Sequence, residues 1–125
     1  MDFRVSREAF LRVLTHVSSI VDSRSTIPIL SNIYIKCENN QIEIRSTDMD
    51  ISIREFVSVD ASKNGEATVN SRILTDIIRK TKKNSIVKCK LEDNRLIINS
   101  DNSVFELNAL SADEFPKFVP LDATN

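Results

Sequence analysis

The sequence predicts an α+β fold built from a βαβββ unit that occurs twice, with two helices packed on antiparallel sheets. Short runs in which apolar and polar residues alternate indicate strands with one buried face and one wet face. Two longer stretches place apolar residues at helical spacing, and each follows a polar residue that can cap a helix. The order of strand, cap, helix and three strands occurs at about 1–58 and again at about 59–111. Because one helix cannot cover the sheet of its own unit, two units that share a core are expected.

The first unit opens with a short strand, Phe3–Val5. Ser6 is a good helix N-cap, and Glu8 in the first turn suits the helix dipole. The helix begins at Arg7, and its apolar stripe is formed by Phe10, Leu11, Val13, Leu14, Val17 and Val21. A polar loop follows at 22–25, and Pro28 is expected to interrupt regular structure before the next strand.

A three-stranded meander completes the first unit. Its strands are expected at Ile33–Cys37, Ile42–Arg45 and Ile51–Arg54, because apolar residues recur there with a period of two. The pair Asn39-Asn40 suits a tight hairpin turn, since Asn tolerates positive φ. Asp60–Gly65, which holds the only glycine, is expected to be a loop.

The second unit repeats this order. A short strand, Ala67–Val69, leads to Asn70 or Ser71 as the cap of a helix at Arg72–Thr81, whose apolar stripe is Ile73, Leu74, Ile77 and Ile78. Three strands follow, at Ile86–Leu91, Leu96–Ser100 and Val104–Leu110. An offset of 64 residues places Val5 on Val69 and Ser6 on Asn70. The whole chain, 1–125, is expected to be one domain, with an extended exit at about 112–125.

Composition sets limits on the class of protein. Hydrophobic residues make up 41% and charged residues 28% of the chain, which is typical of a soluble globular domain. No apolar run of about 18 residues or apolar N-terminal signal segment is present, so a cytoplasmic location is expected. Cys37 and Cys89 lie on the apolar sides of their strands and are expected to be small buried hydrophobes. The net charge of −1 argues against a protein that grips DNA by phosphate neutralisation alone.

No catalytic constellation is present, so the protein is not expected to be an enzyme or to need a cofactor. His16 is the only histidine, lies on a polar helix face and is expected to be an exposed bystander without metal partners. Asp48 and Asp50 lie two residues apart and suit a shared Mg²⁺. Asp at a junction between strands more commonly hydrogen-bonds the turn backbone, which is the favoured interpretation here. A metal-dependent enzyme at this pair is the weakest of three functional hypotheses.

Several basic residues are expected on the outward faces of the two helices or in the loop beside them. By themselves they are compatible with ordinary solvated charges. They are Arg12, Arg24, Arg72, Arg79 and Lys83.

These segments together resemble the first domain of the bacterial replicative sliding clamp, the DNA polymerase III beta subunit. The resemblance rests on F-R-V-S-R-E, R-S-T-I-P-I-L-S-N-I, S-T-D-M-D-I-S-I, V-N-S-R-I-L-T-D-I-I-R and L-S-A-D-E-F-P, which span nearly the whole chain in the expected order. It implies the DNA-clamp fold, in which helices line the hole of a ring and sheets form its outer wall. The ring is a head-to-tail dimer of three-domain subunits that encircles duplex DNA and tethers the polymerase.

The resemblance also implies roles for individual residues. Arg24 matches a loop arginine that contacts DNA, Arg72 and Arg79 match basic positions on a helix that lines the hole, and Arg12 and Lys83 are weaker matches. Phe105 and Leu107 match apolar positions at the seam with the other subunit, and Arg95 matches a charged position there. Two further positions that are basic in the family are Asn102 and Val104 here, so the salt bridges of that seam are not expected to be complete.

The family continues beyond residue 125 into two more domains, so the resemblance implies a longer protein. Its contacts with the polymerase and the clamp loader would use domains that this chain does not contain. The main alternative function is a stand-alone interaction module that recruits a protein partner through the strand around Phe105–Leu107. For a clamp, Leu107→Asp is expected to weaken ring closure in the full-length protein and to leave the isolated domain folded.

Overall fold

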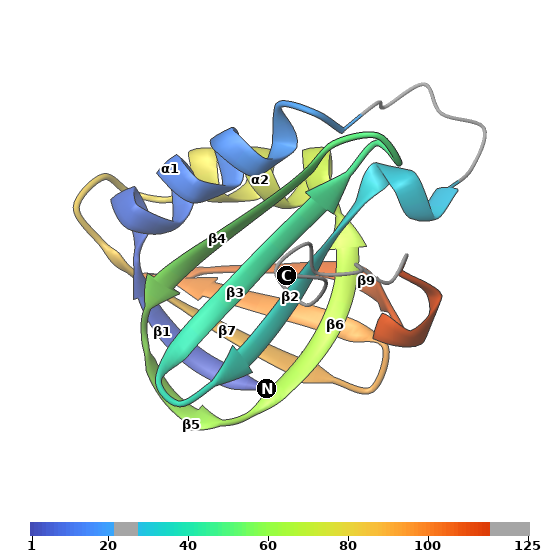
Figure 1. Cartoon of the computed structure of the whole chain (residues 1–125). Coiled ribbons are helices and arrows are strands. Elements are labelled where there is room, and N and C mark those ends of the chain that lie inside the picture. The colour runs from blue at the N-terminus through green and yellow to red at the C-terminus, as the bar shows by residue number, and fades with distance from the viewer. Residues whose placement is uncertain (22–27, 116–125) are drawn as a thin grey trace.

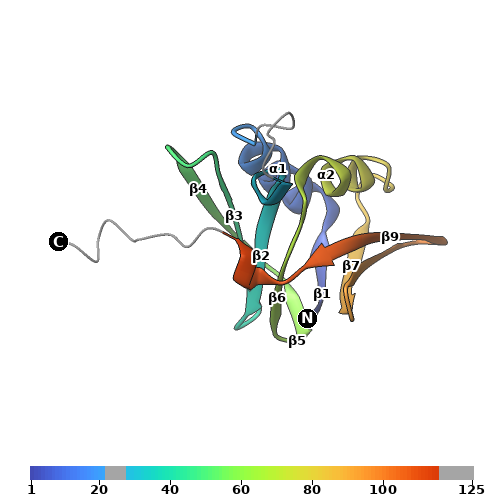
Figure 2. The same ribbon diagram turned by 90° about the vertical axis from the view of Figure 1, so that its right-hand side faces the viewer.

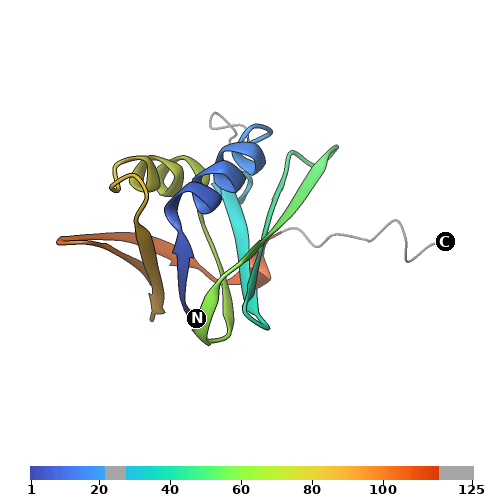
Figure 3. The same cartoon turned by 90° about the vertical axis from the view of Figure 1, so that its left-hand side faces the viewer.

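Two antiparallel helices lie side by side on one face of antiparallel sheets in the computed structural model, which describes residues 1–21 and 28–115 (Figure 1). The helices are α1, Arg7–Ser18, and α2, Ser71–Arg79. Two views at right angles to the first show both helices above the strands on the same side (Figures 2 and 3). The predicted α+β arrangement, with the helices forming one layer, is therefore confirmed.

Nine strands form a continuous antiparallel sheet in the order β4-β3-β2-β6-β9-β8-β7-β1-β5 within the described residues. Two short 3₁₀ helices flank them, η1, Pro28–Ser31, and η2, Ala112–Glu114. The strands are β1 Asp2–Ser6, β2 Asn32–Glu38, β3 Gln41–Thr47, β4 Ser52–Ser58, β5 Asp60–Lys63, β6 Gly65–Asn70, β7 Ile86–Glu92, β8 Arg95–Ser100 and β9 Ser103–Leu110.

The two βαβββ units exchange their first strands. β1 pairs with β7 of the second unit, whereas β6 pairs with β2 of the first unit. Each helix follows one of these exchanged strands directly, so the exchange also places the helices next to each other. Both caps of the predicted repeat are present: Ser6 Oγ accepts from the N–H of Ala9 at 3.4 Å, and Asn70 Oδ1 accepts from that of Ile73 at 2.9 Å.

The segment predicted as a loop at Asp60–Gly65 is instead mostly strand. β5 continues from β4 and pairs with β1. β9 also joins two parts of the sheet, since it pairs with β8 over most of its length and then with β6 at Ala109 and Leu110. The polar sequence of β5 lacks alternation because the strand lies at the end of the sheet order, where little of it is buried.

The core lies between the helix layer and the sheet. Its fully buried side chains come from both helices and from six strands, and include Phe3, Phe10, Leu14, Ile33, Ile35, Ile42, Ile44, Leu74, Ile78, Leu96 and Ile98. Cys37 and Cys89 are buried and unpaired, as predicted, and burial raises the pKa of both thiols. Gly65 meets Met1 so closely that a Cβ would come within 2.8 Å of the Met1 nitrogen, which explains a glycine at this position.

Three local predictions need correction. The third strand of the meander is Ser52–Ser58 rather than Ile51–Arg54, and Ile51 is exposed in the preceding loop. α2 ends at Arg79, so Lys83 lies in the turn after the helix and not on the helix face. Ile73 does not belong to the buried stripe, because 49% of its surface is exposed. The hairpin at Asn39-Asn40 is confirmed, with φ of 57° and 58°.

Asp48 supports the backbone of the turn between β3 and β4. Its Oδ1 accepts from the N–H of Ile51 at 2.7 Å and from that of Asp50 at 2.9 Å. The interpretation of this aspartate as a turn residue is therefore confirmed. These two hydrogen bonds lower the pKa of the Asp48 carboxyl, and the bond from Ile51 has the larger effect.

A pH dependence follows from this carboxylate. Because its folded pKa lies below the unfolded value of about 3.9, its contribution to stability is present above that pH and is lost as pH falls through the folded pKa. Asp48→Asn keeps an oxygen that accepts both bonds but does not titrate. We expect the variant to lose less stability than the parent below about pH 4, measured as the urea unfolding free energy at a series of pH values.

Asp93→Asn is the matched control, because Asp93 also lies in a strand turn and its carboxylate accepts no main-chain hydrogen bond within the described residues. If the parent and Asp48→Asn lost stability in parallel down to pH 2, the stabilising role of the ionised Asp48 carboxylate would be contradicted.

Candidate nucleic-acid interface

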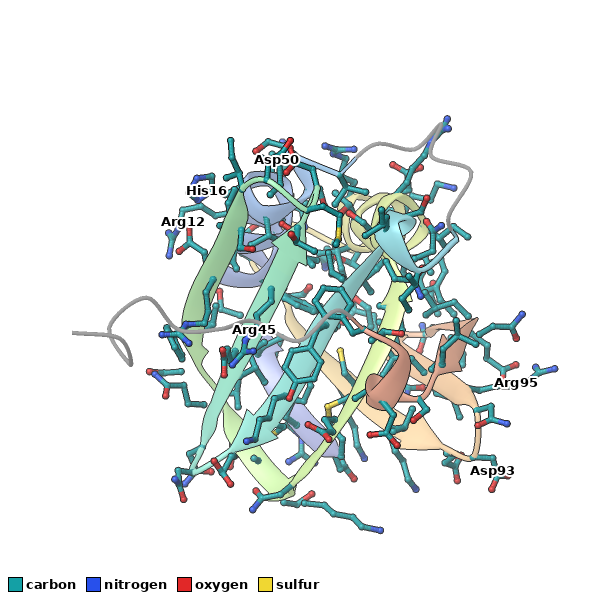
Figure 4. The ribbon with its side chains drawn as sticks, turned by 45° about the vertical axis from the view of Figure 1, so that its right-hand side comes forward. Arg12, His16, Arg45, Asp50, Asp93 and Arg95 are labelled. Carbon is teal, nitrogen blue, oxygen red and sulfur yellow. The ribbon has the colours of Figure 1, made fainter. Side chains whose placement is uncertain are left out.

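Basic side chains project from the outward face of the helix layer. Arg12 on α1 and Arg72 on α2 are exposed, and Figure 4 shows Arg12 pointing away from the body of the molecule. Arg79, in the last turn of α2, is exposed and pairs with Asp76, with Nη1 3.2 Å from Oδ1. Arg72 and Arg79 border one hollow beside the end of α1, whereas Arg12 points towards the flank of β4 (Figure 4). Arg24 lies outside the described residues.

Positive charge is concentrated on α2 and the turn that follows it. Residues 72–83 contain five cations and one anion, so this segment has a formal charge of +4. Because the whole chain has a net charge of −1, the remaining 113 residues carry −5. An acidic protein thus presents a local basic surface beside its helices, which a calculation of net charge conceals.

Arg7 is a buried cation that the sequence did not reveal as important. Only 8% of the residue is exposed. Its Nη2 donates to the carbonyl oxygen of Arg79 at 3.0 Å, and its Nε donates to that of Ile78 at 3.3 Å. Glu8 Oε2 accepts from Arg7 Nη1 at 3.0 Å. The guanidinium at the start of α1 therefore caps the C-terminal end of α2, where a cation is favoured.

The opposite ends of the two helices also meet. Ser18, the last residue of α1, contacts the hydroxyl groups of Ser71 and Thr75 on α2, with its Oγ 3.2 Å from Thr75 Oγ1. Polar contacts thus fix both ends of the helix pair. This fixes the position of α2, which carries Arg72 and Arg79, relative to α1, which carries Arg12.

His16 is exposed, as predicted, but it has a partner. Its Nδ1 pairs with Glu55 Oε2 on β4, although the imidazole remains largely exposed. The contact joins α1 to the strand at one end of the sheet order, and Figure 4 shows His16 near Arg12 at that flank. The pairing with Glu55 suggests a structural role for the histidine.

The other flank of the molecule is formed by β9, whose two faces differ. Leu107 and Ala109 point into the core, and Leu107 is only 7% exposed. Phe105 is half-buried and packs against that core. Val104 and Glu106 are exposed instead. The burial of Leu107 removes the basis for expecting Leu107→Asp to leave the isolated domain undisturbed, because the leucine belongs to the domain's own core.

A shallow hollow of about 480 Å³ lies between β9 and the start of α2. Ile73 and Leu110 contribute exposed apolar surface to it, and Arg95 contributes its charge. Arg95 Nη1 lies 3.7 Å from Glu106 Oε1, and its side chain is 61% exposed. Ile73, which helical spacing assigns to the apolar stripe of α2, is thus exposed because it borders this hollow beside β9.

The outer face of the sheet contains a separate polar and aromatic cluster. The ring of Tyr34 lies between that of Phe115, at 5.8 Å, and the guanidinium of Arg45, at 5.2 Å. Tyr34 donates its hydroxyl hydrogen to Glu66, and desolvation followed by this bond raises the pKa of the phenol. Phe115 is buried, so the expected extended exit is instead ordered as η2 and a packed aromatic residue up to 115. Residues 116–125 lie outside the described part.

Within residues 1–21 and 28–115, no group of three or more His, Cys, Asp or Glu is placed to hold a metal ion. Neither described helix is long and apolar enough to cross a membrane.

Comparison with known proteins gives a consistent result. The sequence model of the family described as DNA polymerase III beta subunit, N-terminal domain, matches residues 1–119. The beta sliding clamp of Pseudomonas aeruginosa is 33% identical over 117 residues, which cover 93% of this chain and 32% of that protein. That of Caulobacter vibrioides is 36% identical over 120 residues, with the same two coverages.

Solved structures show the same relationship. A crystal structure of the Caulobacter crescentus beta sliding clamp matches with a TM-score of 0.93 at 34% identity, and the match covers 97% of this chain and 32% of that one. A Pseudomonas aeruginosa sliding clamp bound to griselimycin matches with a TM-score of 0.91 at 33% identity, covering 94% and 32%. The chain spans about a third of the length of these relatives.

Proposed function

Because this chain belongs to the family of the DNA polymerase III beta subunit and matches its N-terminal domain, we propose that it forms part of a ring-shaped sliding clamp. The ring encircles duplex DNA in the cytoplasm and tethers the replicative polymerase as a processivity factor. It acts without catalysis and without a cofactor. The polymerase and the clamp loader bind through parts of the protein beyond this chain.

The observation that carries the proposal is the charge of +4 on residues 72–83 beside the helix layer of an otherwise acidic domain. Arg72, Arg79 and Arg12, with Lys83 in the adjacent turn and Arg24 in the loop, are the proposed DNA contacts. Arg12, Arg72, Arg79 and Lys83 are long exposed side chains on or directly after the two helices, so they suit phosphate contacts and not the reading of base edges in a groove. Binding is therefore independent of sequence.

The overall charge of −1 suits a protein that is kept on DNA by enclosure. A strongly basic surface would retain the protein by counterion release, and that retention would fall steeply as salt rises. A few contacts, some of them through water, leave the ring free to slide. The topology of the closed ring supplies the retention that phosphate contacts would otherwise have to provide.

The flank of β9 is the proposed seam with a second copy in a head-to-tail ring. Leu107 supports this strand from the core, Phe105 contributes its half-buried ring, and Arg95 contributes its charge. Val104 supplies exposed apolar surface on the outward side. The alternative function, recruitment of an unrelated partner through Phe105 and Leu107, has less support because the side chain of Leu107 is buried in the core and is not available to a partner.

Weak binding to DNA is the expected behaviour of this chain alone. At physiological salt we expect a dissociation constant on the order of 10⁻⁴ M or weaker for any duplex sequence. Arg72→Gln should weaken binding by about fivefold at most, since one exposed charge is worth roughly 1 kcal/mol or less. Fluorescence anisotropy with a labelled duplex at low salt measures both effects.

Arg4→Gln is the matched control, because Arg4 is exposed on β1 and lies on the sheet side. The proposal is contradicted if Arg4→Gln and Arg72→Gln have equal effects, or if the chain alone binds one duplex sequence tightly and selectively. The full-length ring, by contrast, should stay on circular DNA and slide off linear DNA.

A further inference from the structure

Asn64 precedes the only glycine of the chain and is the single residue between β5 and β6. It is exposed, and its side-chain amide forms no hydrogen bond within the described part of the chain. Two other asparagines use their amides to hold the backbone. Asn40 Oδ1 accepts from the N–H of Ala61 at 3.1 Å, and Asn70 Oδ1 caps α2. The amide of Asn64 has no such structural role.

The glycine that follows leaves this amide open to attack by the main chain. Gly65 has no Cβ, so its nitrogen is the least hindered main-chain nitrogen that can follow an asparagine. The glycine itself is needed, because a Cβ there would come within 2.8 Å of the Met1 nitrogen and 2.9 Å of the Met1 Cβ. The contact with Met1 therefore places a glycine directly after an asparagine whose amide is free to react.

We propose that Asn64 is a site of spontaneous deamidation, and that its isoaspartate product releases β5 from β1. The nitrogen of Gly65, after loss of its proton to water or hydroxide, attacks Cγ of Asn64. The bond from Cγ to Nδ2 breaks, ammonia leaves, and a five-membered succinimide ring forms. Water then opens either carbonyl of the ring, which gives aspartate or isoaspartate at position 64. The steps consume one water and release one ammonia, and no atom is oxidised or reduced.

The isoaspartate product changes the path of the chain between two strands that have different partners. Lys63 pairs with Asp2 of β1, whereas Gly65 pairs with Cys37 of β2 (Figure 1). Isoaspartate routes the main chain through its own side chain and adds one carbon to the link. Because Gly65 is held by its close contact with Met1, the displacement falls on β5.

β5 has little to hold it in the sheet. It is four residues long, lies at the end of the strand order, and contains no buried residue. Its pairing with β1 includes a register shift between Asp2 and Phe3. When β5 leaves, the edge of β1 that it covers becomes unpaired, and an unpaired edge can pair with another chain. Deamidation thus turns a protected sheet edge into a site of self-association.

The test is incubation of the purified chain at pH 8 and 37 °C for increasing times, followed by peptide mass spectrometry and enzymatic methylation of isoaspartate. Position 64 should convert at least about tenfold faster than Asn84, Asn94 and Asn102, which are also exposed but precede residues with side chains. In the converted protein the amides of Asp60–Lys63 should exchange their hydrogens about tenfold faster. Light scattering should detect association of the converted protein.

Two variants provide the controls. Asn64→Gln should neither convert nor associate, because its longer side chain forms the corresponding six-membered ring far more slowly. Asn64→Asp introduces the charge without the altered chain path, so it should behave like the fresh parent. Conversion at position 64 no faster than at Asn84 would overturn the site. Equal exchange of the β5 amides in the converted parent and in Asn64→Asp would overturn the release of β5.

Discussion

Leu107→Asp is expected to destabilise the domain by at least about 3 kcal/mol, because it removes a buried leucine and places a carboxylate in the core. Leu107 packs within the cluster that joins both helices to the sheet. No cation lies among the buried hydrophobic residues of that cluster to pair with the new charge. A small domain is stabilised by only about 5–15 kcal/mol in total, so a large part of its stability is lost. Urea denaturation followed by circular dichroism measures the change.

Val104→Asp provides the contrast on the same strand. Val104 is 62% exposed on the opposite face, so the charge stays in water and the expected change in stability is within about 0.5 kcal/mol. In the full-length protein Val104→Asp should still weaken the seam, which sedimentation detects as dissociation of the ring. If Leu107→Asp and Val104→Asp were equally stable as isolated domains, the burial of Leu107 described above would be wrong.

Arg7→Met is expected to destabilise the domain by about 2–3 kcal/mol. Methionine keeps an apolar stem of similar reach but leaves the carbonyl oxygen of Arg79 without the donor that it has at 3.0 Å. It also removes the cation from the end of the α2 dipole. The loss is large for a single charged residue because the guanidinium is buried and makes its hydrogen bonds out of water. The shift in the urea midpoint measures it.

Two further variants separate charge from geometry. Arg12→Met removes an exposed cation from the same helix and should change stability by no more than about 0.5 kcal/mol. Arg7→Lys keeps the charge but lacks the planar fork that reaches two carbonyl oxygens, so an intermediate loss is expected. Equal stability of Arg7→Met and Arg12→Met would show that the contact with α2 contributes nothing.

Local signals in the sequence were sufficient for much of the fold. Ser6 was predicted as a cap, and Asn70 as one of two candidates with Ser71, because the effect of a cap extends only to the next three residues. Asn39 and Asn40 were predicted as a turn because positive φ is a property of the residue itself. The alternation along β2 and β3 follows directly from the burial of one face. These features depend on neighbours in sequence, so no knowledge of the tertiary structure is needed.

The misassigned residues depend on partners that are distant in sequence. β5 is a strand because it pairs with the free edge of β1, some 60 residues away. Its own polar sequence contains no signal of that pairing. Ile73 lies on the apolar side of α2 by spacing, but the helix meets the exposed flank of β9 there. Phe105 and Leu107 share a face, as alternation indicates. Periodicity does not say whether that face meets the core or another molecule.

The candidate site was predictable only in part. Arg12 and Arg72 were recognised as outward-facing from helix periodicity alone. The importance of Arg7 was missed because its partners, the carbonyl oxygens at the end of α2, lie 71 and 72 residues further along the chain. No sequence pattern around a single arginine beside a cap predicts a contact with such distant carbonyl oxygens. Its role depends on the antiparallel placement of the two helices.

The exchange of first strands between the two units determines when the domain can fold during synthesis. β1 is the first strand to leave the ribosome, yet its pairing partners are β5, Asp60–Lys63, and β7, Ile86–Glu92. At about 5–20 residues per second, β1 therefore waits several seconds for the second of them. During this interval Phe3 and Val5 have no sheet to join, so the nascent chain is expected to depend on chaperones and to complete its core late, in one cooperative step.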